Sequence, residues 1–454
     1  MGVKMSLVFD HALLPQGWAR NVRVGLKDGR IDTVEANADA RNAQRVSGVA
    51  LPGLPNLHSH TFQRGMAGLS EQRGNTEDNF WTWRQVMYRF LEKLTPEAVE
   101  AIAAFAFVEM LEAGFTSVAE FHYLHHAPDG QPYGNIAELS ERVVAAAVET
   151  GIGLTLLPVL YAASGFGGAP TSEGQRRFSN SLDRFLALAE KAEDAANRHQ
   201  FQFGVAPHSL RAAPPDALKG LLTARPHGPV HIHVAEQTRE VDDCLAWSGS
   251  RPVQWLLDHV DVGRRWCLIH ATHTDGDEIH RMAKSGAVAG LCPITEANLG
   301  DGIFLAKDYL AQRGSFGVGS DSQIEINAAG ELRQLEYSQR LSHRARNVLS
   351  TDDSSTGKTL YYLALAGGSQ ALARNAGAIE VGRNADIVVL DSAHPSLAHL
   401  SSDRWLDAYI FAAPQGVVRD AFVLGRHVVR DGKHVAREKI ETRYKHTLLQ
   451  LGEL

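Results

Sequence analysis

The middle of the chain alternates short apolar segments with helical patterns, and this alternation limits the possible folds more than any other feature. We expect eight of these segments to be buried strands. The first ends at His58, and the other seven lie at 115–121, 153–160, 202–207, 230–235, 266–270, 287–291 and 315–320. Strands and helices in alternation predict a parallel sheet, and eight strands favour a closed (β/α)₈ TIM-like barrel. The alternative is an open doubly wound sheet, but no GxGxxG follows the first strand and no P-loop sequence occurs.

The two ends of the chain differ from this middle, because both contain alternating apolar runs typical of β-strands. At the N-terminal end such runs lie within 6–35, with a hairpin signal at 27–29, and at the C-terminal end they lie at 386–390, 416–424 and 428–429. Chain ends often lie close together in a domain. We therefore expect residues 1–50 and 377–454 to form one small β-sandwich domain beside a barrel of residues 51–376. Two unrelated terminal caps are the alternative.

Composition narrows the classes of partner. The 454 residues carry 45 basic and 52 acidic side chains, a net charge of −7, without a long single-sign block, so we expect neither a nucleic acid nor an anionic membrane as partner. No apolar run reaches the ~18 residues of a membrane helix. Cys244, Cys267 and Cys292 are odd in number and widely spaced, which favours reduced thiols and a cytoplasmic protein.

Ionisable residues follow six of the eight predicted strands, where the active site of such a barrel lies. His58 and His60 have the spacing that places two imidazoles on one face of a strand, although about one such pair is expected by chance among 21 His, and His231 with His233 forms another. His58, His60, His233 and Asp321 together supply the imidazole and carboxylate ligands of a catalytic zinc site. Taken singly, each His could be a hydrogen-bonded core residue and Asp321 a helix cap. The strand-end residues are His58, His60, Glu120, His122, Tyr123, His208, Arg211, His233, Glu236, His270 and Asp321.

This set resembles the amidohydrolase superfamily over essentially the whole chain. The resemblance extends to the segments at 58–65, 80–84, 121–125, 206–211 and 231–237, and to 382–390 in the terminal β domain. Many members bridge two metals with a carboxylated Lys after the fourth strand, but residues 205–211 contain no Lys. The resemblance therefore implies one Zn²⁺ per chain and the aminohydrolase branch, which releases ammonia from C=N carbons.

Within that branch the resemblance implies hydrolysis of N-formimino-L-glutamate to N-formyl-L-glutamate and ammonia, a step of histidine degradation. It implies that His270 is the general base, assisted by Asp321, and that Glu236 carries a proton to the leaving nitrogen. Paired arginines are the expected clamps for a dicarboxylate. The implied substrate contacts are Arg84 and Arg211, with Gln63, Tyr123 and His208 as hydrogen-bonding partners. Arg84 could alternatively be a surface residue stacked on an aromatic ring.

Two other functions stay open at this point. A purine deaminase or a related aminohydrolase of the same branch would share the metal ligands, but its flat substrate would not need two arginines. A metal-free binding protein on the same barrel is the alternative of another class. No GxSxG or HExxH sequence and no reactive-Cys context supports other hydrolytic chemistry. The expected partner is a small dicarboxylate, and a homodimer is one expected assembly.

Overall fold

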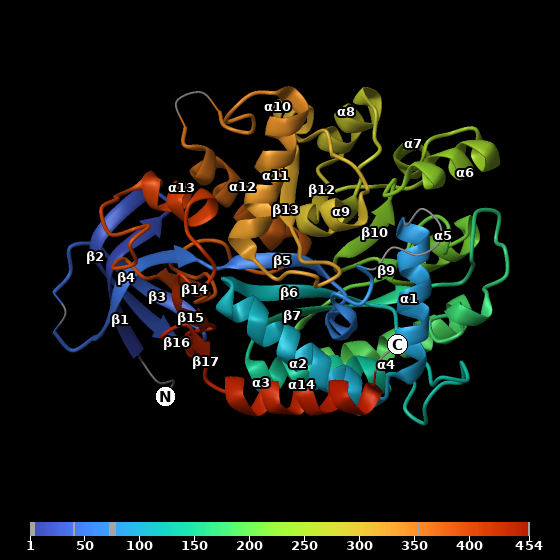
Figure 1. Cartoon of the computed structure of the whole chain (residues 1–454), viewed down its shortest axis with the longest axis horizontal. Helices are drawn as coiled ribbons and strands as arrows, with labels where there is room; N and C mark the ends of the chain where they lie inside the picture. Colours follow the sequence, from blue (N-terminus) through green and yellow to red (C-terminus); the bar gives the residue numbers. More distant parts are fainter. Residues whose placement is uncertain (1–4, 40, 72–78, 352–353, 453–454) are drawn as a thin grey trace.

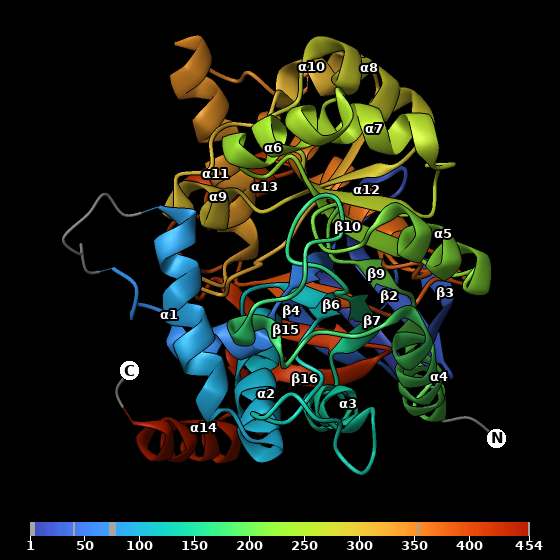
Figure 2. The ribbon, with the colours of Figure 1, turned by 90° about the vertical axis from the view of Figure 1, so that its right-hand side faces the viewer.

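The computed structural model of the chain describes residues 5–39, 41–71, 79–351 and 354–452. Its centre is a group of short parallel strands with helices around it (Figures 1 and 2). The strands pair in the orders β5-β6-β7-β8 and β10-β11-β12-β13, and β9 pairs with β7. Their bounds are β5 Leu54–Ser59, β6 Phe115–His122, β7 Gly153–Leu160, β8 Gln202–Phe203, β9 Ala206–Pro207, β10 Val230–Val234, β11 Trp266–His270, β12 Val288–Leu291 and β13 Ser315–Val318.

Two parallel bridges join these two sets of strands into a closed ring. Val205 pairs with Val230 on one side, and Ser59 pairs with the residue at 321 on the other. The chain therefore has the predicted (β/α)₈ barrel rather than an open sheet. Among the described residues, no helix is long and apolar enough to cross a bilayer.

The predicted strand at 202–207 is observed as two short strands, β8 and β9. Between them the Gly204 amide donates to the Leu156 carbonyl, whereas the Val205 amide donates to the Pro229 carbonyl. Successive amides here thus bond to the two neighbours of the strand in turn, and β9 then pairs with β7 again. A Cβ atom on Gly204 would lie 2.4 Å from the Pro229 carbonyl oxygen, so glycine is required at this close approach.

Helix α2 shows how local sequence sets the outer layer. The Thr95 side chain accepts a hydrogen bond from the Ala98 amide, Pro96 is the first helical residue, and Gly114 follows the helix with φ +102°. The helices are α1 Phe80–Lys93, α2 Pro96–Glu112, α3 Glu138–Thr150, α4 Leu182–Arg198, α5 Pro215–Ala224, α6 Thr238–Ser248, α7 Pro252–His259, α8 Gly276–Ser285, α9 Pro293–Leu299, α10 Ala306–Ala311, α11 Ala328–His343, α12 Thr356–Ala371, α13 Asp403–Phe411 and α14 Arg437–Leu451, with 3₁₀ helices η1 Thr61–Met66 and η2 Glu173–Gln175.

Helix α2 is apolar on nearly all faces because it is covered on both sides. One side packs on the barrel, and α14 from the C-terminal end lies along the other (Figure 1). Tyr444 of α14 stacks face to face on Phe105, with ring centroids 4.0 Å apart. The Tyr444 hydroxyl also donates to the backbone carbonyl of Arg64 in η1. The last helix therefore supports the segment that follows the first barrel strand.

The two chain ends build one sheet, with the strand order β17-β16-β15-β14-β4-β1-β2-β3 among the described residues. Its edge strand β3 also pairs, through Arg30 and Asn384, with the segment that precedes β14, so the sheet curls back on itself. The predicted sandwich-like terminal domain is therefore confirmed in its architecture, whereas its boundaries at 50 and 377 stay predictions. The strands are β1 Met5–Leu14, β2 Gly17–Lys27, β3 Arg30–Glu35, β4 Gln44–Pro52, β14 Ile387–Leu390, β15 Val418–Val423, β16 Arg426–Arg430 and β17 Lys433–His434.

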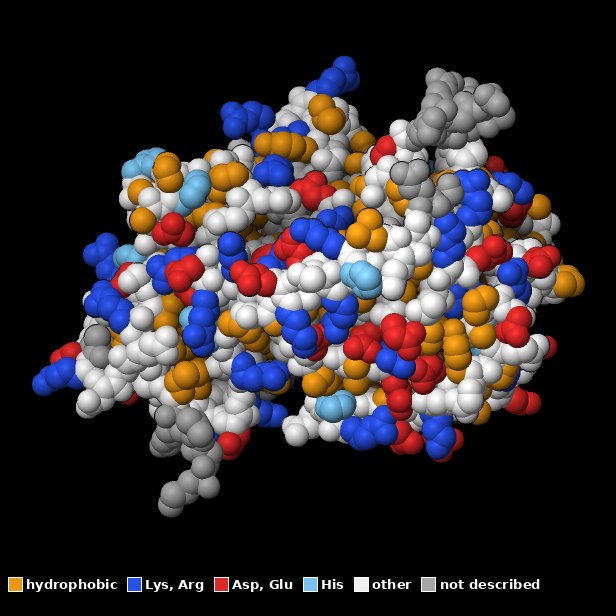
Figure 3. Space-filling model, turned by 60° about the horizontal axis from the view of Figure 1, so that its bottom comes forward, with side chains coloured by type: hydrophobic (Ala, Val, Ile, Leu, Met, Phe, Trp, Pro, Cys, Tyr) orange, Lys and Arg blue, Asp and Glu red, His pale blue; other side chains and the backbone are white. Residues whose placement is uncertain are grey.

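Acidic and basic side chains are mixed over the face of the molecule that Figure 3 presents. Part of this mixture consists of ion pairs between α14 and the barrel helices. Arg437 pairs with Glu112 of α2, and Arg443 pairs with Glu149 of α3. These pairs are partly buried at the surface, where ion pairs contribute about 0–1 kcal/mol each, so the apolar contacts of α14 matter more for its position.

Candidate active site

The four predicted metal ligands lie close together where barrel strands end. His58 is in β5, His60 directly follows it, His233 is in β10 and Asp321 follows β13. The backbone holds two of these segments together, because the His60 amide donates to the Asp321 carbonyl and the Asp321 amide donates to the His58 carbonyl, both at 3.0 Å. The His-x-His segment and Asp321 therefore form one hydrogen-bonded unit.

The donor atoms of this cluster face one another. His58 Nε2 lies 3.1 Å from both His60 Nε2 and His233 Nε2. The Nδ1 atoms of His60 and His233 lie 2.9 and 3.1 Å from the backbone carbonyls of Phe121 and His208. A carbonyl only accepts, so each Nδ1 carries the proton and each Nε2 presents a lone pair. Three close imidazole nitrogens, at least two of them with lone pairs, form an arrangement that a bound cation would stabilise.

The spacing of the donors fits zinc. Asp321 Oδ1 lies 3.4 Å from His58 Nε2 and 3.3 Å from His60 Nε2, and all four donor atoms lie within 4.8 Å of one another. Tetrahedral zinc with bonds of about 2.0–2.1 Å holds its ligand atoms about 3.3 Å apart. Burial lowers the pKa of His58 to about 3 and also lowers the pKa values of His60 and His233, which keeps these imidazoles neutral, as metal ligands must be.

The second His-x-His pair does not contribute both of its residues. His231 lies two residues before His233 on β10, and its Nε2 hydrogen-bonds to the Ala371 carbonyl at 2.9 Å, away from the cluster. Residues two apart on a strand share a face but lie about 6.6 Å apart along it. Only His233, at the C-terminal end of its strand, reaches the cluster.

His270 lies next to the cluster between acidic side chains. Its Nδ1 lies 3.2 Å from Glu296 Oε1, while its Nε2 lies 3.7 Å from Glu236 Oε1 and 3.8 Å from Asp321 Oδ2. His270 also has a left-handed backbone with φ +67°, a strained conformation that costs of order 1–3 kcal/mol and is common at functional sites. Glu296 thus orients the ring, and Nε2 faces the pocket.

The electrostatics of His270 follow from these neighbours. Burial alone would lower its pKa, but the charge of Glu236 and the hydrogen bond to Glu296 raise the pKa to about 10. Burial raises the pKa of the Asp321 carboxyl, but the hydrogen bond with His58 and the nearby imidazoles lower this pKa by more, so that it lies below its usual range. A bound cation would act against protonation of His270. His270 and Glu236 are therefore two ionisable side chains in contact at the edge of the ligand cluster.

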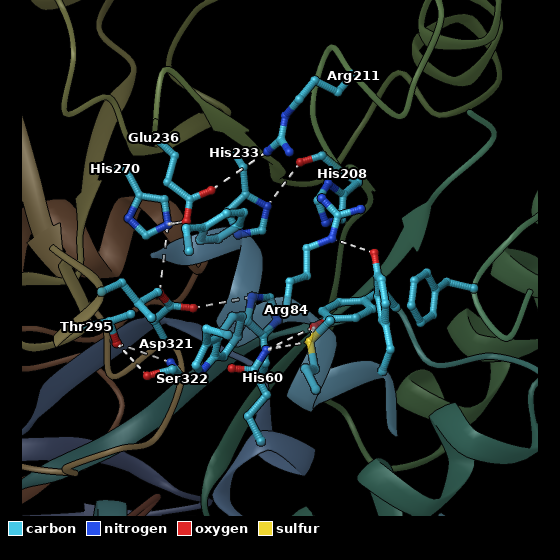
Figure 4. Close-up of a pocket in the computed structure, with 18 of the residues that line it drawn as sticks. His60, Arg84, His208, Arg211, His233, Glu236, His270, Thr295, Asp321 and Ser322 are labelled. Carbon is cyan, nitrogen blue, oxygen red and sulfur yellow. Dashed lines mark hydrogen bonds and ion pairs between the residues drawn. The ribbon is translucent and has the colours of Figure 1, made fainter. Parts of the chain in front are cut away.

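One pocket contains the cluster and the predicted substrate contacts (Figure 4). The space between its walls, including the open mouth, is about 570 Å³. The predicted residues that line it are His60, Gln63, Arg84, Tyr123, His208, Arg211, His233, Glu236, His270 and Asp321. His58 lies beneath them, fully buried. The structure therefore brings all of the predicted site residues together, and their individual roles stay predictions.

Two arginines enter the pocket from different elements. Arg84 of α1 stacks on Trp81 and Tyr88, each at 5.3 Å from the ring centroid, and still lines the pocket. The aromatic-stacking alternative for Arg84 thus describes how it is held. Arg211, which follows β9, is about nine-tenths buried, and its Nη2 lies 3.8 Å from Glu236 Oε2. Both guanidinium groups are placed to meet an anionic ligand.

The other predicted contacts form a polar edge of the pocket. Gln63 Nε2 donates to the Tyr123 hydroxyl at 2.9 Å, and that hydroxyl lies 3.2 Å from Met87 Sδ. The His208 ring lines the pocket, while its backbone carbonyl orients His233. His208 therefore serves the ligand cluster through its backbone as well as facing the pocket through its side chain.

Sequence reasoning missed two carboxylates that support the site, Glu296 and Glu240. Glu240 is fully buried, and its Oε2 lies 3.7 Å from Arg211 Nη2 and accepts a hydrogen bond from the Glu236 amide. Glu296 follows the seventh barrel strand, the one strand end besides the third that lacked an ionisable candidate. That gap was the available signal for Glu296, which lies in α9 just after the seventh strand, whereas no such gap pointed to Glu240 in α6.

Glu120 was among the strand-end residues, but it faces away from the pocket. Its carboxylate accepts hydrogen bonds from the Ser59 hydroxyl and from the amide and hydroxyl of Thr61. Burial raises the pKa of Glu120 to about 7 despite these hydrogen bonds. Glu120 therefore holds the His-x-His segment from behind.

A closed barrel with a buried His-His-His-Asp cluster and further ionisable side chains at one pocket is an arrangement found in metal-dependent hydrolases. Residues 49–428 match the amidohydrolase family, and residues 5–48 match the N-terminal domain of formimidoylglutamate deiminase HutF. A formimidoylglutamate deiminase of Pseudomonas aeruginosa is 54% identical over 439 residues, which cover 96% of this chain and 97% of that protein. The chain belongs to the amidohydrolase family and groups with its formimidoylglutamate deiminases.

Solved structures agree with this placement. A crystal structure of an amidohydrolase from Brucella melitensis has a TM-score of 0.94 and 51% identity, and covers 98% of this chain and 99% of that one. An adenosine deaminase from Xanthomonas campestris with bound zinc has a TM-score of 0.82, covers 98% of both chains and is 21% identical. At that identity the second likeness supports the fold alone.

Proposed function

We propose that this protein, a hydrolytic deiminase by its family, converts N-formimino-L-glutamate and water into N-formyl-L-glutamate and ammonia. The observation that carries the proposal is that one pocket is lined both by the ligand cluster with its proton carriers and by Arg84 and Arg211. The first set suits hydrolysis at a C=N carbon. The two arginines suit a substrate with two carboxylates.

We propose zinc as the resident metal, held by His58, His60, His233 and Asp321. When bound, Zn²⁺ lowers the pKa of a water molecule from ~16 toward ~7, which makes a nucleophile available at neutral pH. The neutral imidazoles and the ionised Asp321 are the protonation states that this ion requires.

The proton transfers fall to His270, Asp321 and Glu236. In the reaction a C–O bond forms at the formimino carbon, the bond to the terminal nitrogen breaks, and that nitrogen gains both protons of the water before it leaves as ammonia. His270 Nε2, held in place through Glu296, accepts the first proton beside Asp321 Oδ2. Glu236, 3.7 Å from the same Nε2, delivers a proton to the leaving nitrogen.

The rest of the pocket binds the glutamate part of the substrate. Arg84 and Arg211 offer fork-shaped donors for the two carboxylates, and Gln63, Tyr123 and His208 supply further hydrogen bonds. The positive charge of Arg211 is neutralised by the carboxylates of Glu236 and Glu240. A substrate carboxylate that binds Arg211 would take the place of these carboxylates as its partner.

A substrate panel tests the proposal. Purified protein is assayed for ammonia release from N-formimino-L-glutamate, N-formimino-L-aspartate, guanine and adenosine. We expect the glutamate derivative to be the best substrate, with a margin of about 10–200-fold over the shorter aspartate derivative. Preferential release from a purine would instead support the purine deaminase alternative.

Three finer expectations belong with this proposal. The reaction would be a step of histidine degradation. The three cysteines are buried free thiols, which supports a cytoplasmic setting. We also expect a homodimer, which sedimentation equilibrium of the purified protein would test.

A further inference from the structure

A second group of potential ligands lies beside the first and includes a cysteine. His270, Cys292 and Asp321 each offer a donor atom, and these atoms lie within 4.8 Å of one another. All three side chains are buried. Cys292 directly follows β12 and precedes α9, so it comes from the seventh strand end of the barrel. The reaction proposed above gives Cys292 no part.

Asp321 divides its two oxygens between the two groups. Its Oδ1 faces His58 and His60, whereas its Oδ2 is the oxygen nearest to His270 Nε2, at 3.8 Å (Figure 4). A carboxylate in this orientation can bind two cations at once, one through each oxygen. Occupation of the first site therefore leaves Oδ2 available.

His270 is also oriented for a ligand at Nε2. Its Nδ1 is engaged by the Glu296 carboxylate at 3.2 Å, which fixes the proton on Nδ1 when the ring is neutral. Glu236 Oε1 lies 3.7 Å from the same Nε2, but among the described residues it does not belong to the group whose donor atoms lie within 4.8 Å of one another. The resulting set is one nitrogen, one sulfur and one carboxylate oxygen.

We propose that His270, Cys292 and Asp321 Oδ2 form a second, inhibitory site for a thiophilic divalent cation such as Zn²⁺. A thiolate ligand selects zinc and softer ions over Mg²⁺ or Ca²⁺. An imidazole, a thiolate and a carboxylate are all ligands that zinc accepts, and a fourth position would stay open to water. Binding there releases the thiol proton.

Occupation of this site blocks the reaction because it uses the lone pair of His270 Nε2. The activity readout rests on the proposed function, in which His270 accepts a proton. We expect excess Zn²⁺ to lower turnover by about 10²-fold or more, the contribution of a lost acid or base. Mg²⁺ should not inhibit at the same concentration.

Absorption spectroscopy with Co²⁺ tests the site without relying on activity. Zinc-loaded protein is titrated with Co²⁺, and the near-ultraviolet thiolate-to-cobalt band is followed. The first ligand cluster contains no sulfur, so the band reports only a site with Cys292 or another thiol. We expect the band in the wild-type protein and in Cys244→Ala and Cys267→Ala, and no band in Cys292→Ala.

The control cysteines are matched in burial. Cys244 and Cys267 are buried free thiols that belong to neither ligand group. Loss of zinc inhibition in Cys292→Ala, with activity in low zinc retained, would agree with the proposal. Absence of the band from the wild-type protein, or its persistence in Cys292→Ala, overturns the proposal. A protein that shows the band but no deiminase activity would refute the proposed function alone.

Discussion

His270 Nδ1 and Glu296 Oε1 lie 3.2 Å apart, and this contact decides which ring nitrogen of His270 faces the pocket. Without it the ring could rotate or carry its proton on the other nitrogen. Glu296 also accepts the amide hydrogen of Cys292 through the same oxygen, which ties the start of α9 to the catalytic centre. The residue missed from the sequence thus sets the orientation of one that was predicted.

Replacement of Glu296 should impair turnover more than binding. We expect Glu296→Ala to lower kcat by about 10–10²-fold, a typical cost of losing a supporting carboxylate, with KM for N-formimino-L-glutamate little changed. Glu296→Gln keeps an acceptor for the Nδ1 hydrogen and should recover part of the loss. Equal damage in both variants, or normal kcat in Glu296→Ala, would contradict the orienting role. Steady-state kinetics with zinc analysis distinguishes these results.

Replacement of Glu236 should remove a proton carrier without removing the metal. Glu236→Gln is expected to lower kcat by about 10²–10⁴-fold while zinc content stays at the wild-type level. The exposed Glu190→Gln on α4 is the control and should behave as wild type. Wild-type turnover in Glu236→Gln would exclude Glu236 from the mechanism.

Replacement of Arg84 should weaken binding of the dicarboxylate. A hydrogen bond to a charged group contributes about 1.5–3 kcal/mol, so Arg84→Met should raise KM roughly 10- to 150-fold. Arg89→Met, at an exposed position of the same helix, is the matched control and should leave KM unchanged. Similar KM values for the two variants would mean that Arg84 only stacks on its aromatic neighbours.

Gly319 should be intolerant of any side chain. A Cβ atom there would lie 2.7 Å from both the amide nitrogen and the carbonyl oxygen of His58, and backbone atoms cannot easily move aside. We expect Gly319→Ala to lower the free energy of unfolding by about 1–3 kcal/mol and to reduce zinc retention. Gly276→Ala, where the Cβ would meet no atom within 4 Å, should be neutral. Urea unfolding and zinc analysis of both variants measure this, and equal stability of the two would refute it.

Much of the barrel could be predicted because its strands are short, buried and bounded by turns. The strand ending near His58 and those near 153–160 and 266–270 lie within a residue or so of their observed bounds. The need for glycine at position 204 could not be predicted, since it depends on the close approach of the Pro229 carbonyl from a later segment. Likewise, nothing in the sequence of α2 identifies α14 as its cover.

Those residues of the candidate site that lie at the ends of barrel strands could be predicted from the sequence. The barrel brings all strand ends to one face, so His58, His60, His233 and Asp321 needed no further signal. Glu240 and Glu296 act through contacts that join separate elements, and spacing along the chain does not encode those contacts. The pair His231 and His233 shows the same limit. The two residues differ only in their position along β10, which makes His231 a buried core residue and brings His233 to the ligand cluster.

The central claim is that this pocket uses a metal to release ammonia from N-formimino-L-glutamate. The most direct measurement is a reconstitution series, in which metal-free protein receives increasing Zn²⁺ up to one equivalent and ammonia release is measured with zinc content on the same samples. We predict that activity rises in proportion to bound zinc and reaches its maximum at one ion per chain. Full ammonia release by the metal-free protein, or none at one bound zinc, would contradict the account.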